Sequence, residues 1–134
     1  MPSNGLTIAW TGTDQRLNVE SQKGGKVTLH ETSGHHPAVT ALGGKLYLAW
    51  TGTDSRLNVV VSQDGKTFTN KVTLSETSGN GPALANDGKA LFLGWTGTDE
   101  RLNELTSTDG GKTWSNKVTL SERSTMSMAE TGGF

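Results

Sequence analysis

The sequence predicts an all-β protein assembled from repeated four-stranded units, and two observations support this prediction. The first is composition: 20 of the 134 residues are Thr and 18 are Gly, and Val, Thr and aromatic residues fill short runs separated by Gly, Asn, Asp and Ser. Strands and turns favour these residue types. No stretch of ten residues has the apolar period of a helix. The second observation is an internal repeat, and together they predict a β-propeller with three blades in each chain.

The repeat unit spans about 45 residues and covers nearly all of the chain. Its first block is LTIAWTGTDQRLNV from Leu6, which recurs as LYLAWTGTDSRLNV from Leu46 and LFLGWTGTDERLN from Leu91. A second block recurs as KVTLHETS, KVTLSETS and KVTLSERS, starting at positions 26, 71 and 117. A third block, PAVTALGGK and then PALANDGKA, completes the unit.

Each unit is expected to hold four strands, which in the third unit cover residues 82–85, 91–96, 102–107 and 117–121. Apolar residues alternate with other residues along these segments, as the side chains of a strand point to opposite faces in turn. Four short strands in about 45 residues, with turn residues between them, are typical of a propeller blade. The alternation is clearest in the middle unit, where Leu46, Leu48 and Trp50 alternate with Tyr47 and Ala49, and where Leu57, Val59 and Val61 share one face.

The ends of the repeat predict how the blades assemble. The three blades are expected at residues 6–36, 37–81 and 82–124. The first unit lacks a strand-one block, whereas residues 125–134 repeat that block. A closed ring usually has at least about four blades, and strand exchange removes exposed sheet edges. We therefore expect a homodimer in which two chains form a six-bladed ring, each supplying the strand at 125–134 to the other's first blade. The alternative is a fragment of a longer propeller.

The third unit carries a motif with a family resemblance. Residues 107–114, STDGGKTW, match the pattern Ser-x-Asp-x-Gly-x-Thr-Trp residue for residue. The chain thus resembles sialidase-like propellers built of Asp-box (BNR) repeats, where the box forms the turn between the third and fourth strands of a blade. A shorter version stands at 62–68, and only SQKGG remains at 21–25. The resemblance implies a structural role, since the Asp can accept backbone N–H bonds and the aromatic can anchor the turn. The box residues are Ser62, Asp64, Phe68, Ser107, Asp109, Gly111, Thr113 and Trp114.

The resemblance does not extend to catalysis. A sialidase of this fold needs three convergent Arg residues, a Tyr with a partnering Glu, and an acid/base Asp. Here Arg16, Arg56 and Arg101 occupy one repeated position, so each belongs to a different blade, and Tyr47, the single Tyr, lies in mid-strand. No acid pair distinct from the repeats suits glycosidase chemistry, and no nucleophile motif is present. The sequence predicts that the protein is not an enzyme and has no catalytic residue.

The repeated loops predict a glycan site instead. The loops between strands two and three are expected to share one ring face with the loops that join blades. Sugars are bound by an aromatic face and by planar polar groups that bond hydroxyls in pairs, and several weak sites on one ring would give avidity. The candidate glycan-binding residues are Trp10, Asp14, Arg16, Asn18, Trp50, Asp54, Arg56, Asn58, Trp95, Asp99, Arg101, Asn103, Glu31 and Glu76.

A structural interpretation of the same residues stays open. Each Trp continues the apolar alternation and fits a core position between blades, and Thr-Gly-Thr-Asp fits a hairpin turn that the Asp caps. His35 and His36 occur in one loop only, which favours a solvated loop over a metal site. Glu104 replaces the Val of the other units and is either a rim residue or a paired buried charge.

Composition excludes several function classes. The net charge is −1, from 12 basic and 13 acidic residues, which does not favour nucleic-acid binding. No apolar run reaches the length of a membrane span, the start has no signal-peptide pattern, and the chain has no Cys. We expect no membrane insertion, metal or cofactor. The function expected is a lectin-like propeller; the alternatives are a non-binding or engineered self-assembling scaffold and a degenerate sialidase-type targeting domain.

Overall fold

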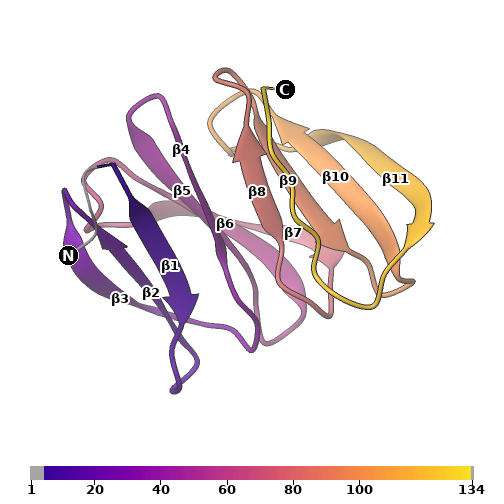
Figure 1. Ribbon diagram of the computed structural model, residues 1–134, viewed down its shortest axis with the longest axis horizontal. Helices are drawn as coiled ribbons and strands as arrows, with labels where there is room; N and C mark the ends of the chain where they lie inside the picture. Colours follow the sequence, from indigo (N-terminus) through magenta and orange to yellow (C-terminus); the bar gives the residue numbers. More distant parts are fainter. Residues whose placement is uncertain (1–4, 134) are drawn as a thin grey trace.

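The computed structural model describes residues 5–133 and contains eleven strands and no helix within that range (Figure 1). The strands form three antiparallel sheets, in the orders β1-β2-β3, β4-β5-β6-β7 and β8-β9-β10-β11. Their bounds are β1 Thr7–Thr11, β2 Arg16–Ser21, β3 Gly25–Thr32, β4 Ala38–Leu42, β5 Lys45–Thr51, β6 Arg56–Ser62, β7 Thr69–Thr77, β8 Ala83–Asn86, β9 Leu91–Thr96, β10 Arg101–Ser107 and β11 Ser115–Arg123.

The three sheets confirm the all-β prediction and correspond to the three repeat units. The segment predicted at 91–96 coincides with β9, while β11 is longer than the predicted 117–121. The extension arises because β11 continues to pair with β10 from Thr106↔Ser115 to Arg101↔Arg123, across two irregular steps. Below, the sheets are called the first, second and third sheet in chain order.

The core consists of two clusters, each between adjacent sheets. Strand β5 supplies both: Leu48 and Trp50 lie in the cluster shared with the first sheet, and Tyr47 and Ala49 lie in the cluster shared with the third. All four are buried, so the predicted alternation is confirmed with both faces covered. Full burial of one large aliphatic or aromatic side chain stabilises a fold by about 1.5–3 kcal/mol.

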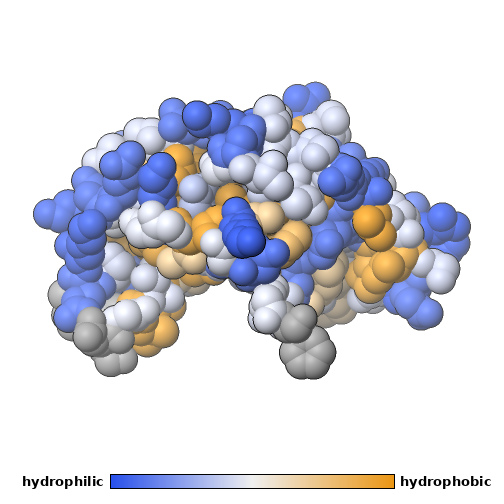
Figure 2. Space-filling model, turned by 90° about the horizontal axis from the view of Figure 1, so that it is seen from above, coloured by the Kyte–Doolittle hydropathy of each residue, from blue (hydrophilic) through white to orange (hydrophobic). Residues whose placement is uncertain are grey.

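The two outer faces of this stack are open. Ile8 on β1 is 46% exposed, whereas Leu48 and Leu93 at the matching positions of β5 and β9 are fully buried. Leu120 on β11 is 47% exposed, whereas Leu29 on β3 is 9% exposed. Seen from above, the molecule is an arch with hydrophobic surface near both ends (Figure 2). We call Leu6, Ile8 and Trp10 the first open face, and Leu102, Glu104, Val118, Leu120 and Met128 the last open face.

Residues 125–133, here called the tail, form no strand within the chain and run past β8 and β9 (Figure 1). The Thr96 hydroxyl donates to the Met126 carbonyl at 2.6 Å. Further along, a Cβ on Gly132 would lie 2.1 Å from the Asn86 carbonyl oxygen, so only Gly fits against β8 there. The predicted pairing of this segment with a first sheet therefore stays a prediction, and residue 134 lies outside the described residues.

Candidate functional site

The turn between the second and third strands of each unit is fixed by its own sequence. In the second sheet the Gly52 N–H donates to the Arg56 carbonyl at 2.8 Å, and the Asp54 Oδ1 accepts the Arg56 N–H at 3.0 Å. A Cβ on Gly52 would lie 2.8 Å from the Asp54 Oδ1, so any other residue would displace the carboxylate that caps the turn. Ser55 has a φ of 70°, a left-handed conformation that completes the tight turn. The same bonds recur at Asp14 and Asp99.

An Asn on each third strand is held by two hydrogen bonds. The Asn58 Nδ2 donates to the Arg56 carbonyl at 3.0 Å, and the Thr73 hydroxyl donates to the Asn58 Oδ1 at 2.6 Å. Asn58 is 5% exposed, so both polar groups of its amide are used inside the sheet. Asn18 and Asn103 repeat the arrangement with Thr28 and Thr119.

The three Trp residues do not share one environment. Trp50 and Trp95 are each 1% exposed, because the neighbouring sheet covers them. Neither offers a ring face to a sugar, so the expected stacking role is corrected for these two: they are core residues. Lys71 lies 5.6 Å from the Trp50 ring centroid and forms an ion pair with Glu31 at 2.9 Å.

The first unit has the Trp and the Lys of this arrangement but, in the part of the chain that the structure describes, lacks the ion pair. Trp10 is only half-buried, and Lys26 lies 5.9 Å from its ring. In the third unit Lys117 lies 5.8 Å from the Trp95 ring and pairs with Glu76 of the second sheet at 3.0 Å. Lys26 has no ion pair with any residue between 5 and 133.

Two equivalent grooves result, one at each boundary between sheets. The groove between the first and second sheets has a volume of about 240 Å³, and the one between the second and third has about 410 Å³. The smaller is lined by Glu31, Trp50, Asp54, Asn58, Lys71 and Thr73 among others, and the larger by Glu76, Trp95, Asp99, Arg101, Asn103 and Lys117 among others.

Few of the groove groups remain free for a ligand. The side chains of Asn58 and Lys71 are engaged in the bonds above, and each turn Asp uses one carboxylate oxygen for its cap. The Arg101 guanidinium is exposed, lines the larger groove and has no partner within residues 5–133. Arg56 does not line the smaller groove. The larger groove therefore presents a free guanidinium and a second carboxylate oxygen of Asp99.

The Asp-box residues brace the turns between the third and fourth strands. The Asp109 carboxylate accepts the Thr113 hydroxyl at 2.5 Å and the Lys112 and Thr113 N–H groups at 3.1 and 3.0 Å. These bonds, that from the Thr113 hydroxyl above all, lower the pKa of Asp109 to about 2. The Ser107 hydroxyl accepts the Gly111 N–H at 2.9 Å, and the Trp114 indole donates to the Gly111 carbonyl at 3.1 Å.

The shorter boxes keep part of this arrangement. Asp64 accepts the Thr67 and Lys66 N–H groups, which lower the pKa of its carboxyl, and Phe68 packs against the core cluster between the first and second sheets. In the first unit the Ser21 hydroxyl still accepts the Gly24 N–H at 3.0 Å. None of the box residues lines either groove.

One contact escaped the sequence reasoning: the Ser that ends each KVTL block joins neighbouring sheets. The buried Ser33 hydroxyl donates to the Thr51 carbonyl of the second sheet at 2.6 Å, and Ser78 donates to the Thr96 carbonyl of the third at 2.7 Å. The matching Ser124 bonds locally to the Met126 carbonyl at 3.3 Å. The repeated Ser-Gly or Ser-Thr step was the available signal.

Residues considered for catalysis or metal binding lie elsewhere. Arg16, Arg56 and Arg101 each follow a turn of a separate sheet, and Tyr47 is 4% exposed in the core. The His35 carbonyl accepts the Thr11 hydroxyl at 2.6 Å. Within residues 5–133, no three His, Asp or Glu side chains gather where they could hold a metal ion.

The sequence matches no family model, and no curated protein sequence matches it either. Within the described range, no helix has the length and apolar character to cross a membrane.

Proposed function

We propose that the protein is a non-catalytic, lectin-like propeller that binds glycans in the grooves between its blades. The observation that carries the proposal is the larger groove. That groove is lined by Arg101, whose guanidinium has no partner within residues 5–133, and by Asp99, whose backbone cap uses one carboxylate oxygen and leaves the other available. Guanidinium and carboxylate groups bond neighbouring hydroxyls in pairs, which is how planar polar groups recognise sugars.

Binding in this proposal is polar rather than aromatic. The buried Trp95 forms the floor of the groove, and Lys117, paired with Glu76, forms one wall. The rigid turn and the internally bonded Asn103 fix the positions of the free groups, which lowers the entropy lost on binding. One groove of this kind binds weakly, and repetition around a ring supplies avidity.

We propose further that two chains close into a six-bladed ring. The two open faces are the two halves of the interface that already occurs twice within the chain. Ile8 matches Leu48 and Leu93, which are buried against the preceding sheet. Leu120 matches Leu29, which is buried against the following sheet. A second copy supplies the missing half of each.

The charged and hydrogen-bonding groups of the two open faces also correspond to those of the internal interfaces. At the two internal interfaces, Lys71 pairs with Glu31 and Lys117 with Glu76. The third such pair is Lys26 of one copy with Glu122 of the other, at opposite ends of the arch. In the same way Ser124 is set to bond the Thr11 carbonyl of the second copy, as Ser33 bonds Thr51.

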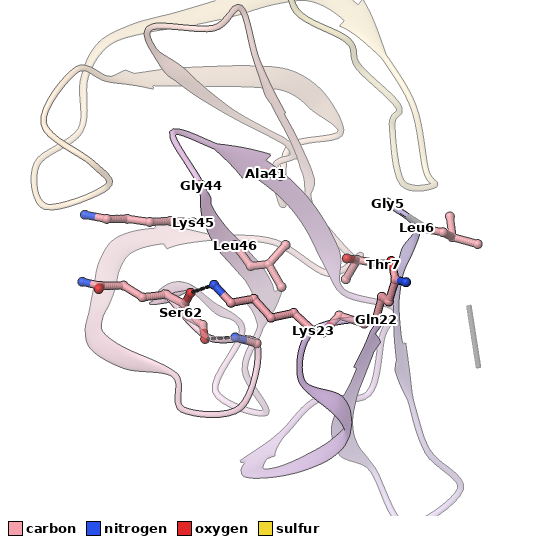
Figure 3. Close-up of a pocket in the computed structure, with 13 residues that line it drawn as sticks. Gly5, Leu6, Thr7, Gln22, Lys23, Ala41, Gly44, Lys45, Leu46 and Ser62 are labelled. Carbon is pink, nitrogen blue, oxygen red and sulfur yellow. Dashed lines mark hydrogen bonds between the residues drawn. The ribbon is translucent and has the colours of Figure 1, made fainter. Parts of the chain in front are cut away.

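A cavity beside the first sheet supports the proposed exchange of a strand. It has a volume of about 390 Å³ and lies between the first and second sheets, lined by Leu6 and Thr7 of the first and Ala41 of the second among others (Figure 3). Within the third sheet, the equivalent place is filled by β8, which pairs with β9 and whose Asn86 amide donates to the Ala41 carbonyl at 2.8 Å. The tail of a second copy fits there as a first strand.

The absence of catalysis and the kinship with sialidase-like Asp-box propellers belong to the same proposal. Its support is the braced Asp109 turn, the separation of the three repeated Arg residues on three sheets, and the burial of Tyr47.

A glycan array tests the binding proposal, followed by affinity measurement on the best ligand. The double variant Asp99→Asn with Arg101→Gln should weaken binding at least about tenfold, the loss expected when one pair of charge-assisted bonds is removed. Lys112→Gln is the matched control, because Lys112 is exposed on the Asp-box turn and should leave affinity unchanged. An array without any ligand at high protein concentration would instead favour a self-assembling scaffold.

A further inference from the structure

The open faces differ from the internal interfaces at one set of positions. At each internal interface three aliphatic side chains meet: one from the third strand of the preceding sheet, and one each from the first and third strands of the following sheet. At the last open face, Glu104 stands at the position on the third strand of the preceding sheet. Glu130 of the tail stands at the position on the first strand of the following sheet. At the first open face the third position holds Glu20, which is paired with Ile8 as Val60 is with Leu48. The internal sets are Val19, Val39 and Val60, and Val59, Leu84 and Leu105.

The tail brings two of these carboxyls together within one chain. A Cβ on Gly94 would lie 2.5 Å from the Glu130 Oε1, and β5 and β1 have Ala49 and Ala9 at this position. The missing methyl group makes room for the Glu130 carboxyl. Both of its oxygens are buried and, within residues 5–133, have no hydrogen-bond partner other than the facing Glu104 carboxyl.

The surroundings of Glu130 are apolar or negative. Strands β8 and β9, which pack against the tail, carry no charged residue, and from β10 the facing charge is Glu104. Asp87, after β8, uses its carboxylate to accept the Lys89 and Ala90 N–H groups. On β11, Lys117 is paired with Glu76, and Glu122 and Arg123 are exposed at the end of the strand.

These surroundings favour the protonated form of the Glu130 carboxyl when the tail packs against β8 and β9. Burial, and after it the charge of Glu104, raises the pKa of Glu130 from its ordinary 4.5 to about 8. The docked tail therefore binds more protons than a free one between these values. The docked state is most stable below about 4.5 and loses stability as the pH rises toward about 8.

We propose that the interface between two copies is acid-gated: Glu130 of the tail lies buried beside Glu104 on the last open face, which a second copy covers, so the ring closes when Glu130 is protonated and opens as Glu130 ionises. This inference rests on the proposed ring. Repetition supplies the aliphatic template, and Glu104 and Glu130 replace aliphatic residues of that template at the interface that the proposed second copy completes. The internal interfaces stay closed at any pH at which the chain is folded.

Sedimentation equilibrium of the full chain at about pH 5 and about pH 8 tests the proposal. The dimer dissociation constant should rise at least about tenfold between the two, since each ionising carboxyl at the contact adds up to tenfold per pH unit. The double variant Glu104→Val with Glu130→Leu copies the second internal interface and should dimerise with little pH dependence. Glu130→Gln, a smaller change, should reduce the dependence in the same direction. Glu100→Gln is the control, because Gln15 stands at the matching position of the first turn.

The outcomes separate this inference from the proposed ring. A wild-type dimer with the same dissociation constant at both pH values would overturn acid gating and leave the ring intact. Full pH dependence in the double variant would show that other groups are responsible. A folded monomer at both pH values, in the wild type and in the double variant, would overturn the ring itself.

Discussion

The two internal interfaces and the two open faces are made of the same repeated residues, yet they differ in burial. Trp50 and Trp95, at the internal interfaces, are each 1% exposed, while Trp10 is half-buried at the first open face. The sequence around the three is almost identical. What differs is the presence of a neighbouring sheet, so the stability of each sheet depends on its neighbour as well as on its own residues.

The comparison also shows where the repeat has diverged. The internal interfaces keep aliphatic residues at three meeting positions, and the open faces carry Glu20, Glu104 and Glu130 there. Carboxyls cost little on an exposed face and much in an apolar contact unless they are protonated. Contacts inside the chain thus keep aliphatic residues at all three positions, and the proposed contact between chains would depend on the protonation of Glu130.

The largest effect should separate a buried Trp from an open one. Trp50→Ala removes a fully buried side chain and should cost about 3–5 kcal/mol of unfolding free energy, as large-to-small core substitutions do. Trp10→Ala should cost clearly less at about pH 8, where the chain is expected to be monomeric, and should weaken dimerisation at about pH 5. Urea unfolding and sedimentation provide the two measurements. Equal losses of stability at about pH 8 would remove the distinction between the two environments.

A smaller difference in stability is expected between substitutions of Lys71 and Lys26, which stand at matching positions of the repeat. Lys71→Ala breaks a half-exposed ion pair with Glu31 inside the chain and should cost about 0–1 kcal/mol, less at high salt. Lys26→Ala should leave the stability of the monomer unchanged and raise the dimer dissociation constant by a few-fold at low salt. If Lys26→Ala has no effect on dimerisation and Lys71→Ala destabilises the chain, Lys26 does not pair with Glu122 of a second copy.

The repeat predicted much of the fold. Strand positions, the two faces of β5 and the turn role of the Asp box follow from period-two alternation and turn chemistry, which depend on neighbours in the sequence. Alternation assigns a side chain to a face but does not say whether another sheet covers that face. For this reason the sequence left the role of Trp50 and Trp95 undecided.

Other parts of the site depend on contacts between distant residues. Glu104 and Glu130 meet only because the tail passes Gly94, and nothing in their spacing indicates it. The bond from Ser33 to the Thr51 carbonyl joins two sheets and is equally invisible in either block alone. These contacts follow from how the sheets stack, which local pattern does not specify.

The solution mass of the full chain at about pH 5 tests the central claim most directly. Closure of the arch by a second copy predicts a mass of twice 14.2 kDa by light scattering or native mass spectrometry. A variant ending at Met126 lacks the exchanged strand and should not form this dimer. A folded full chain that stays at 14.2 kDa under these conditions, or a truncated variant that forms the same dimer, would contradict closure by strand exchange.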